Sequence, residues 1–276
     1  MPTTAHPLND TISSSVSSNA VSSESFDREQ LSLAFRLAEK FGLHEGICNH
    51  FSVQLDGEEE LYLINPYGVH WSQMRPELLL LINAQGNKVS GEGTVEDSAL
   101  FIHLAAHKAN PRHKAVLHTH MPYATTLTML DGDAGKLPMS HQTATRFYGR
   151  IAYEPNFGGL AHNAEEGERI SKKSAKSNAN SASDSSDVDI LFLAHHGVVV
   201  NGSTIALAFD DLYYLERACR QHVFALQTGA PIKQIPEEVV KLTAAQIQRD
   251  LAFFAEKHFL ALAAVLKEDP NHHFIL

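Results

Sequence analysis

The sequence predicts an α/β fold, built as one layered domain over residues 25–276. Segments whose apolar residues recur three and four positions apart, as on one face of a helix, alternate with short apolar runs typical of buried strands. Hydrophobic residues make up 43% of the chain and charged residues 20%, which is ordinary for a globular protein. A chain of 276 residues can bury a sizeable core. The alternation of helices and strands favours helices layered on a sheet.

Two polar segments are expected outside the packed domain. Residues 1–24 are rich in Ser, Thr and Asn, and they hold too little apolar surface to offset the loss of chain entropy, so we expect a disordered tail. Residues 171–187 form a second low-complexity stretch. We interpret this stretch as a surface insertion, because closure entropy grows slowly with loop length.

The first ordered elements are a helix and three strands. Leu31 and Phe35 belong to an apolar face at helical spacing, and Gly42 follows as a stop signal. The strands expected next are residues 50–55, 61–64 and 78–82. Asp56-Gly57, between the first two strands, is typical of a hairpin turn.

A central helix and strand follow. Thr94, with acidic residues just after it, is typical of a helix start, and Pro111 prevents continuation beyond Asn110. A strand is expected from Ala115 to His120, with another helix after Pro122.

The remaining elements are two strands and two long helices. Strands are expected at residues 188–194 and 198–200. A helix over residues 204–228 would end at Gly229, and a final amphipathic helix would cover residues 242–265.

Charge and cysteine content exclude several classes of protein. The net charge of −10 and a pI near 5.9 disfavour non-specific binding to nucleic acid or anionic membranes. No apolar run reaches the about 20 residues that a membrane span needs. Cys48 and Cys219 are the only cysteines, and the N-terminus has no secretory signal pattern, so we expect reduced thiols and a cytoplasmic location.

Histidines at two strand ends predict a metal site. His118 and His120 are separated by one residue, so both imidazoles lie on the same face of the expected strand. A third histidine, from the pair His195-His196 after the second buried strand, would complete three nitrogen ligands with an open position. Such a set suits a catalytic divalent ion. The alternative is that these histidines are ordinary hydrogen-bonded residues at strand ends.

The chain resembles the class II aldolase/adducin family over roughly residues 27–230. The resemblance is carried by Gly42-Leu-His-Glu-Gly46, Asn49 and Ser52, Ile64-Asn-Pro-Tyr-Gly68, the helix at 97–110, Ala115-Val-Leu-His-Thr-His120, Leu193-Ala-His-His-Gly197 and Gly202. It implies a three-layer αβα fold with a mixed, largely antiparallel sheet covered by helices on both faces. It also implies metal ligands at His118, His120 and His196, with His195 at a position that is not a ligand.

The acid/base position of the family's aldolases differs in this chain. Those enzymes carry a Glu before the first histidine motif, and the matching position is Ala99, which cannot transfer a proton. Glu96, one helical turn earlier, and His195 are the candidate catalytic residues in its place. Glu96 could instead be a simple helix cap.

The phosphate site of the sugar-phosphate members differs as well. The candidate substrate-binding residues at the matching positions are Asn49, His50, Tyr67, Gly68, Asp97 and Ser98. Asp97 would repel a phosphate, whereas backbone donors and small hydroxyls attract one. A non-phosphorylated hydroxy or keto acid is therefore at least as good a candidate ligand as a sugar phosphate.

A second group of histidines has two interpretations. His103 and His107 share a helix face four residues apart. They could form a second metal site, or they could be a buried pair with satisfied hydrogen bonds.

Three functions fit these observations. The first is a metal-dependent aldolase or decarboxylase that stabilises an enolate of a small substrate, with zinc favoured and manganese, iron or cobalt as alternatives. The second is an adducin-like protein that binds actin, and the third is an iron-dependent oxidoreductase. The resemblance also implies a homotetramer.

Overall fold

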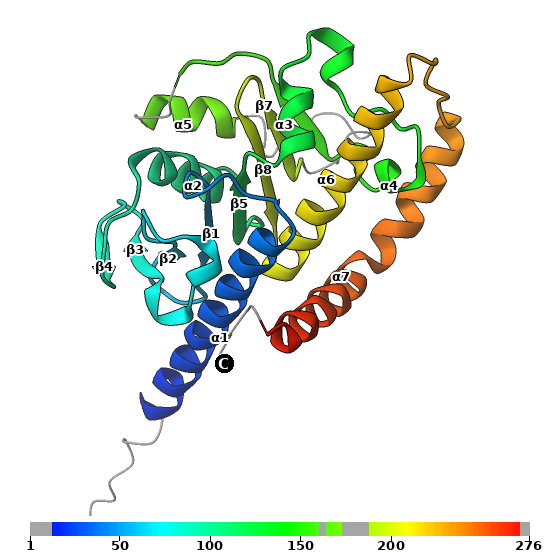
Figure 1. Ribbon diagram of the computed structural model, residues 1–276. Helices are drawn as coiled ribbons and strands as arrows, with labels where there is room; N and C mark the ends of the chain where they lie inside the picture. Colours follow the sequence, from blue (N-terminus) through cyan, green and yellow to red (C-terminus); the bar gives the residue numbers. More distant parts are fainter. Residues whose placement is uncertain (1–12, 160–163, 173–187, 271–276) are drawn as a thin grey trace, which may run out of the picture.

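The computed structural model describes residues 13–159, 164–172 and 188–270, and Figure 1 shows their arrangement. The strands are β1 His50–Gln54, β2 Leu61–Ile64, β3 Leu80–Asn83, β4 Lys88–Ser90, β5 Ala115–Thr119, β6 Ile151–Glu154, β7 Ile190–Leu193 and β8 Gly197–Gly202. The helices are α1 Ser13–Lys40, α2 Asp97–Ala109, α3 Pro122–Thr128, α4 Gln142–Thr145, α5 Ala164–Ser171, α6 Ile205–Gln227 and α7 Glu237–Glu268. Short 3-10 turns are η1 Trp71–Gln73, η2 Pro76–Leu78 and η3 Gly132–Gly135.

The strands form one mixed sheet in the order β4-β3-β2-β1-β5-β8-β7-β6. Neighbouring strands pair antiparallel except β6 and β7, which are parallel. Because β5 is antiparallel to both neighbours, its carboxyl end lies beside the amino ends of β1 and β8. Three segments distant in sequence therefore meet at one edge of the sheet.

Helices cover both faces of the sheet, as predicted (Figure 1). On one face, α1, α3 and α6 pack over inward side chains such as Phe51, Leu117 and Val198. On the other face, α2 and α5 pack over the alternate side chains, among them Val116 and Val199. α7 packs against α6 on the outside. Alternation along each strand thus supplies one core layer on each face.

Several element boundaries differ from the sequence prediction. α2 begins after Glu96, whose side chain caps it by accepting from Ala99 N, so Thr94 is not the cap. The third strand starts at Leu80, because Pro76 opens a 3-10 turn just before it. α7 begins at Glu237, a full turn before the predicted start.

The predicted tail overlaps the start of α1. α1 begins at Ser13, so residues 13–24 belong to a helix, while residues 1–12 lie outside the described part. Once packing fixes the later part of α1, each residue added at its start gains a backbone hydrogen bond at low cost. An ion pair of 2.7 Å between Arg28 and Glu24 stabilises this extension.

The predicted insertion at 171–187 begins inside α5, since Ser171 is the last residue of that helix and is buried. Residues 173–187 of the insertion lie outside the described residues. Within the described chain, no helix has the length and apolar content to cross a membrane.

Candidate metal centre

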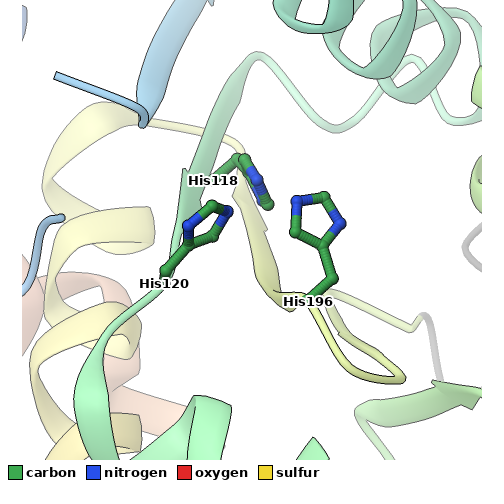
Figure 2. Close-up of side chains that lie close together, drawn as sticks. All are labelled: His118, His120 and His196. Atoms are coloured by element: carbon green, nitrogen blue, oxygen red, sulfur yellow. The ribbon is translucent and has the colours of Figure 1, made fainter. Parts of the chain in front are cut away.

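Three imidazoles converge at the sheet edge where β1, β5 and β8 meet. His118 and His120 come from the end of β5, and His196 comes from the turn between β7 and β8 (Figure 2). One nitrogen from each ring lies within 4.8 Å of the other two. The structure therefore brings together the three histidines that the resemblance implies as ligands.

Hydrogen bonds orient two of these rings. Nδ1 of His118 donates to the carbonyl oxygen of Val198 at 2.9 Å, and Nδ1 of His120 donates to Oε2 of Glu45 at 2.6 Å. A carbonyl and a carboxylate can only accept, so each ring keeps Nε2 as its lone-pair nitrogen. Acceptors of this kind commonly fix the tautomer and orientation of histidines that bind a metal.

The donor set fits a divalent ion. Nε2 of His120 is buried and has no hydrogen-bond partner among the described atoms, as expected for a nitrogen that binds a metal. Burial, together with the neighbouring imidazoles of His196 and His50, lowers the pKa of His118 well below its usual range. A neutral imidazole is the form that a metal requires.

Asn49 holds the loop that carries Glu45. The side-chain oxygen of Asn49 accepts from Glu45 N at 2.7 Å and from His120 N at 3.4 Å. Asn65 donates to the Asn49 carbonyl at 3.3 Å, and Asn49 is fully buried. These contacts give Asn49 a positioning role between the loop and β5, in addition to the predicted substrate contact.

His50 and Glu96 lie next to the three histidines. His50 pairs with His118 across β1 and β5, and their rings stack with centroids 5.0 Å apart. Nε2 of His50 lies 3.6 Å from Oε2 of Glu96. The contact with His50 and hydrogen bonds from Ser98 lower the pKa of Glu96 to about 2. Glu96 is therefore an ionised helix cap, and so low a pKa makes it a weak base.

The other predicted substrate positions lie around the start of α2. Tyr67 N donates to Thr94 O at 2.8 Å, which holds the Tyr67-Gly68 loop beside this helix. Tyr67 is half exposed, and Gly68 has a φ of +87° that favours glycine. Asp97 is exposed, whereas the hydroxyl of Ser98 donates to Glu96.

Ala99 occupies an apolar position. It is 1% exposed and packs in a cluster with Ile64 and Leu80 on the sheet. No proton-transfer group is therefore present at the position where the family's aldolases carry Glu.

His195 lies outside the three-histidine cluster. It occupies the turn between β7 and β8 with a φ of +58°, and its backbone N–H donates to Thr128 O at 3.1 Å. Its exposed ring lies 6.3 Å from that of Phe157, beside a cavity of about 440 Å³ lined in part by Lys136 and Glu154. The turn thus directs His196 to the cluster and His195 to the rim of this cavity.

The second histidine group is a buried hydrogen-bonded pair. Ser52 Oγ lies 2.5 Å from His103 Nδ1 and 2.8 Å from His107 Nε2, so the hydroxyl bridges both rings. Glu45 and Ser52 belong to the sequence motifs of the family resemblance, but the sequence alone predicts no role for either residue. A carboxylate within the Gly42–Gly46 motif was the available signal for Glu45.

Comparison with known proteins shows the family of this chain. The model of the class II aldolase and adducin N-terminal domain family matches residues 29–223. A Caulobacter vibrioides protein named "Putative aldolase class 2 protein" is 30% identical over 203 residues, 73% of each chain. The decarboxylase NovR of Streptomyces niveus is 28% identical, covering 82% of this chain and 78% of NovR. Rat alpha-adducin is 28% identical over 74% of this chain, but only 26% of adducin is covered.

Solved structures show the same architecture. An aldolase II superfamily protein from Pseudomonas syringae has a TM-score of 0.79 at 26% identity, covering 94% of this chain and 99% of that chain. An L-fuculose 1-phosphate aldolase from Glaciozyma antarctica has a TM-score of 0.73 at 22% identity, covering 96% of both chains. At this identity the similarity concerns the fold and not the activity. The predicted three-layer αβα fold is confirmed.

Proposed function

Because the chain belongs to the class II aldolase and adducin N-terminal domain family, we propose that it is a metal-dependent lyase of the aldolase or decarboxylase type. Its substrate would be a small hydroxy or keto acid or a sugar-derived compound. The observation that carries this proposal is the convergence of three imidazole nitrogens, two of them held in the metal-binding tautomer by Val198 O and Glu45.

His118, His120 and His196 would hold the ion. Zinc is favoured by a set of three nitrogen ligands, with manganese, iron or cobalt as alternatives. When bound, such an ion supplies Lewis acidity that favours negative charge on a substrate oxygen. The buried sheet edge around His118 excludes water from one side of this position, which strengthens that interaction.

The chain's own residues define the substrate end of the site. Glu96 and His50 face each other beside His118, and Asp97 adds a negative charge at the start of α2. This arrangement disfavours a phosphate and favours uncharged hydroxyl groups. Ala99 cannot transfer a proton. The groups proposed to do so are His195 and, despite its low pKa, Glu96.

A matched set of variants tests the metal assignment. His120→Ala and His196→Ala should each lower the metal content of purified protein from about one ion per chain to a small fraction, measured by elemental analysis. His195→Ala is the control and should keep the metal. Full occupancy in a double variant lacking both His120 and His196 would refute the assignment.

The lyase proposal has its own test. Zinc-loaded protein is incubated with a panel of small hydroxy and keto acids, and cleavage or loss of CO₂ is followed. Relatives such as NovR, named a decarboxylase, favour this class of reaction. A metal-loaded protein that turns over no acid but sediments with actin filaments would favour the adducin-like alternative. Oxygen-dependent turnover with iron alone would favour the oxidoreductase.

Assembly and location complete the proposal. Large apolar side chains are exposed along α7, among them Leu242, Phe253 and Phe254 at 58–59%. A second copy of the chain would cover such a face, so we propose a homotetramer, tested by light scattering at micromolar concentration.

Cys48 and Cys219 are both outside disulfides, in keeping with a cytoplasmic location.

A further inference from the structure

A second cavity lies between α6, the loop that follows this helix and the segment before α4. Its volume is about 340 Å³, a size that suits a small molecule. One wall carries polar side chains, from Ser140, His141, Gln221, His222 and Lys233. The other wall is apolar and includes Ala225, Pro231 and Ile232. None of the described lining residues belongs to the three-histidine cluster, so this cavity is a separate candidate site.

Hydrogen bonds hold the walls of this cavity in place. Thr228 Oγ1 donates to Ala225 O at 2.7 Å and accepts from Ala230 N at 3.1 Å, which fixes the turn at the end of α6. Ile235 N donates to Met139 O at 3.2 Å, which joins the loop after α6 to the segment before α4. The cavity is therefore preformed, and a ligand can bind without first ordering these segments.

Two imidazole nitrogens at this cavity have no hydrogen-bond partner among the described atoms. They are Nε2 of His141 and Nδ1 of His222, and both atoms are buried. His222 is only 5% exposed. Buried polar atoms in proteins are normally paired, so two unpaired nitrogens at one cavity indicate a ligand that would bond to them.

Helix geometry brings the two rings to the same side of α6. The His141 ring forms a hydrogen bond with the backbone of Ala218, and His222 follows Ala218 by one helical turn. Residues four apart lie on one face of a helix, and their side chains lean toward its N-terminus. The His222 side chain therefore lies over the turn that the His141 ring contacts.

The charges around this cavity favour an anion. The whole chain has a net charge of −10, yet none of the described residues that line the cavity is acidic, and the exposed Lys233 adds a positive charge. Burial lowers the pKa of His141 and of His222, and no carboxylate opposes either shift. An anion beside the two rings would favour their protonated form, in which both ring nitrogens donate. A metal ion would find two imidazoles here, without a carboxylate or thiolate to complete its ligands.

We propose that this cavity binds a small organic anion. Its carboxylate or phosphate group accepts hydrogen bonds from His141, His222 and Lys233, while its carbon skeleton packs on Ala225 and Ile232. A protonated His141 can donate to the Ala218 carbonyl and to the anion at the same time. The site is independent of the proposed lyase activity, because it shares no residue with the metal centre.

The first test compares three probes that differ in charge and skeleton. Zinc-loaded full chain with ¹⁵N-labelled histidine is titrated separately with isobutyrate, isobutyramide and inorganic phosphate. Isobutyrate should shift the ring ¹⁵N signals of His141 and His222 saturably, with a Kd at least about tenfold below that of isobutyramide, which has the same shape without the charge. Tighter binding of isobutyrate than of phosphate assigns the site to carboxylic acids, whereas the reverse assigns it to phosphorylated compounds.

The second test uses variants of the lining residues. His222→Leu and Lys233→Ala should each raise the Kd for isobutyrate by about tenfold or more, measured from the His141 signals. Lys233 is exposed, so its replacement tests the site even if His222→Leu fails to fold. Lys88→Ala, at an exposed position on β4, is the matched control and should bind isobutyrate normally.

Three outcomes would overturn the inference. The first is that neither anion shifts either ring signal, and the second is that isobutyramide binds as tightly as isobutyrate. The third is a second zinc ion per chain after incubation with excess zinc, present in the unmodified protein and absent in His222→Leu by elemental analysis. That result would make the cavity a metal site. Each outcome leaves the proposed lyase activity untouched, since His118, His120 and His196 are unchanged in every variant.

Discussion

Gly197 lies directly against His120. A Cβ atom placed on Gly197 would come within 2.8 Å of His120 Cδ2 and 2.5 Å of the Thr119 carbonyl oxygen. The backbone of Gly197, the first residue of β8, thus lies closer to the end of β5 than a residue with a Cβ atom could. This contact positions the turn that carries His196 against the ring of His120.

Gly197→Ala should therefore weaken metal binding. The added methyl group must displace either the His120 ring or the start of β8, and displacement of one ligand costs about tenfold or more in affinity. Zinc affinity measured by competition with a chelator checks the result. Gly57→Ala is the matched control, since a Cβ there meets nothing within 4 Å. An unchanged affinity in Gly197→Ala would show that the close contact does not position the ligand.

Glu45→Gln should reduce zinc affinity by about tenfold to a hundredfold. The carboxylate accepts from His120 Nδ1 at 2.6 Å, and an amide in its place accepts more weakly or presents N–H groups to the ring. The same competition assay measures the change. Glu58→Gln, at an exposed position, should bind zinc normally. Equal affinity in both variants would remove Glu45 from the metal centre.

The common face of His118 and His120 could be predicted because it depends on a local rule, whereas the choice of His196 over His195 came from the family resemblance. Two residues apart at the end of a strand, His118 and His120 share a face whatever the rest of the fold does. Glu45 could not be assigned in this way. Its contact with His120 depends on a loop that folds back onto β5 and is held there by Asn49, and sequence spacing does not encode such a long-range contact.

Strand prediction succeeded for buried strands and failed for two edge strands. β4 is exposed along its whole length, so it has no apolar run that would signal a strand. β6 is short, and most of its residues are only partly buried.

The cap of α2 illustrates a different limit. Thr94 and Glu96 are both capable acceptors, and only the chain path settles which of them faces the helix N-terminus.

Glu216→Ala should destabilise the protein by about 2–3 kcal/mol. The buried carboxylate of Glu216, on α6, accepts from Tyr123 N at 2.8 Å and Ala124 N at 2.9 Å, and so it caps α3 just after His120. Removing it leaves two helix donors unsatisfied in the interior. Glu216→Gln keeps one acceptor oxygen and should lose less. Urea unfolding compares the variants, and equal midpoints for both would contradict a capping role.

Asp27→Asn should stabilise the protein relative to the unmodified chain, and this gain should be larger at neutral pH than at acid pH. Burial, with help from the nearby Asp56 carboxylate, raises the pKa of Asp27 from 3.8 to about 6, although Lys114 opposes the shift. The folded state then holds a proton that the unfolded state has released. The contribution of Asp27 to stability is therefore complete below pH 3.8 and is lost as the pH rises through about 6.

The asparagine amide cannot ionise, so the variant avoids this loss. The stability difference between Asp27→Asn and the unmodified protein should grow by about 1–2 kcal/mol between pH 4 and pH 7, after allowance for solvent screening. Urea midpoints measured at pH steps across this range give the difference directly. Asp131→Asn, at an exposed position, should show no such trend. A pH-independent difference for Asp27→Asn would mean that Asp27 ionises at the same pH in the folded and unfolded chains.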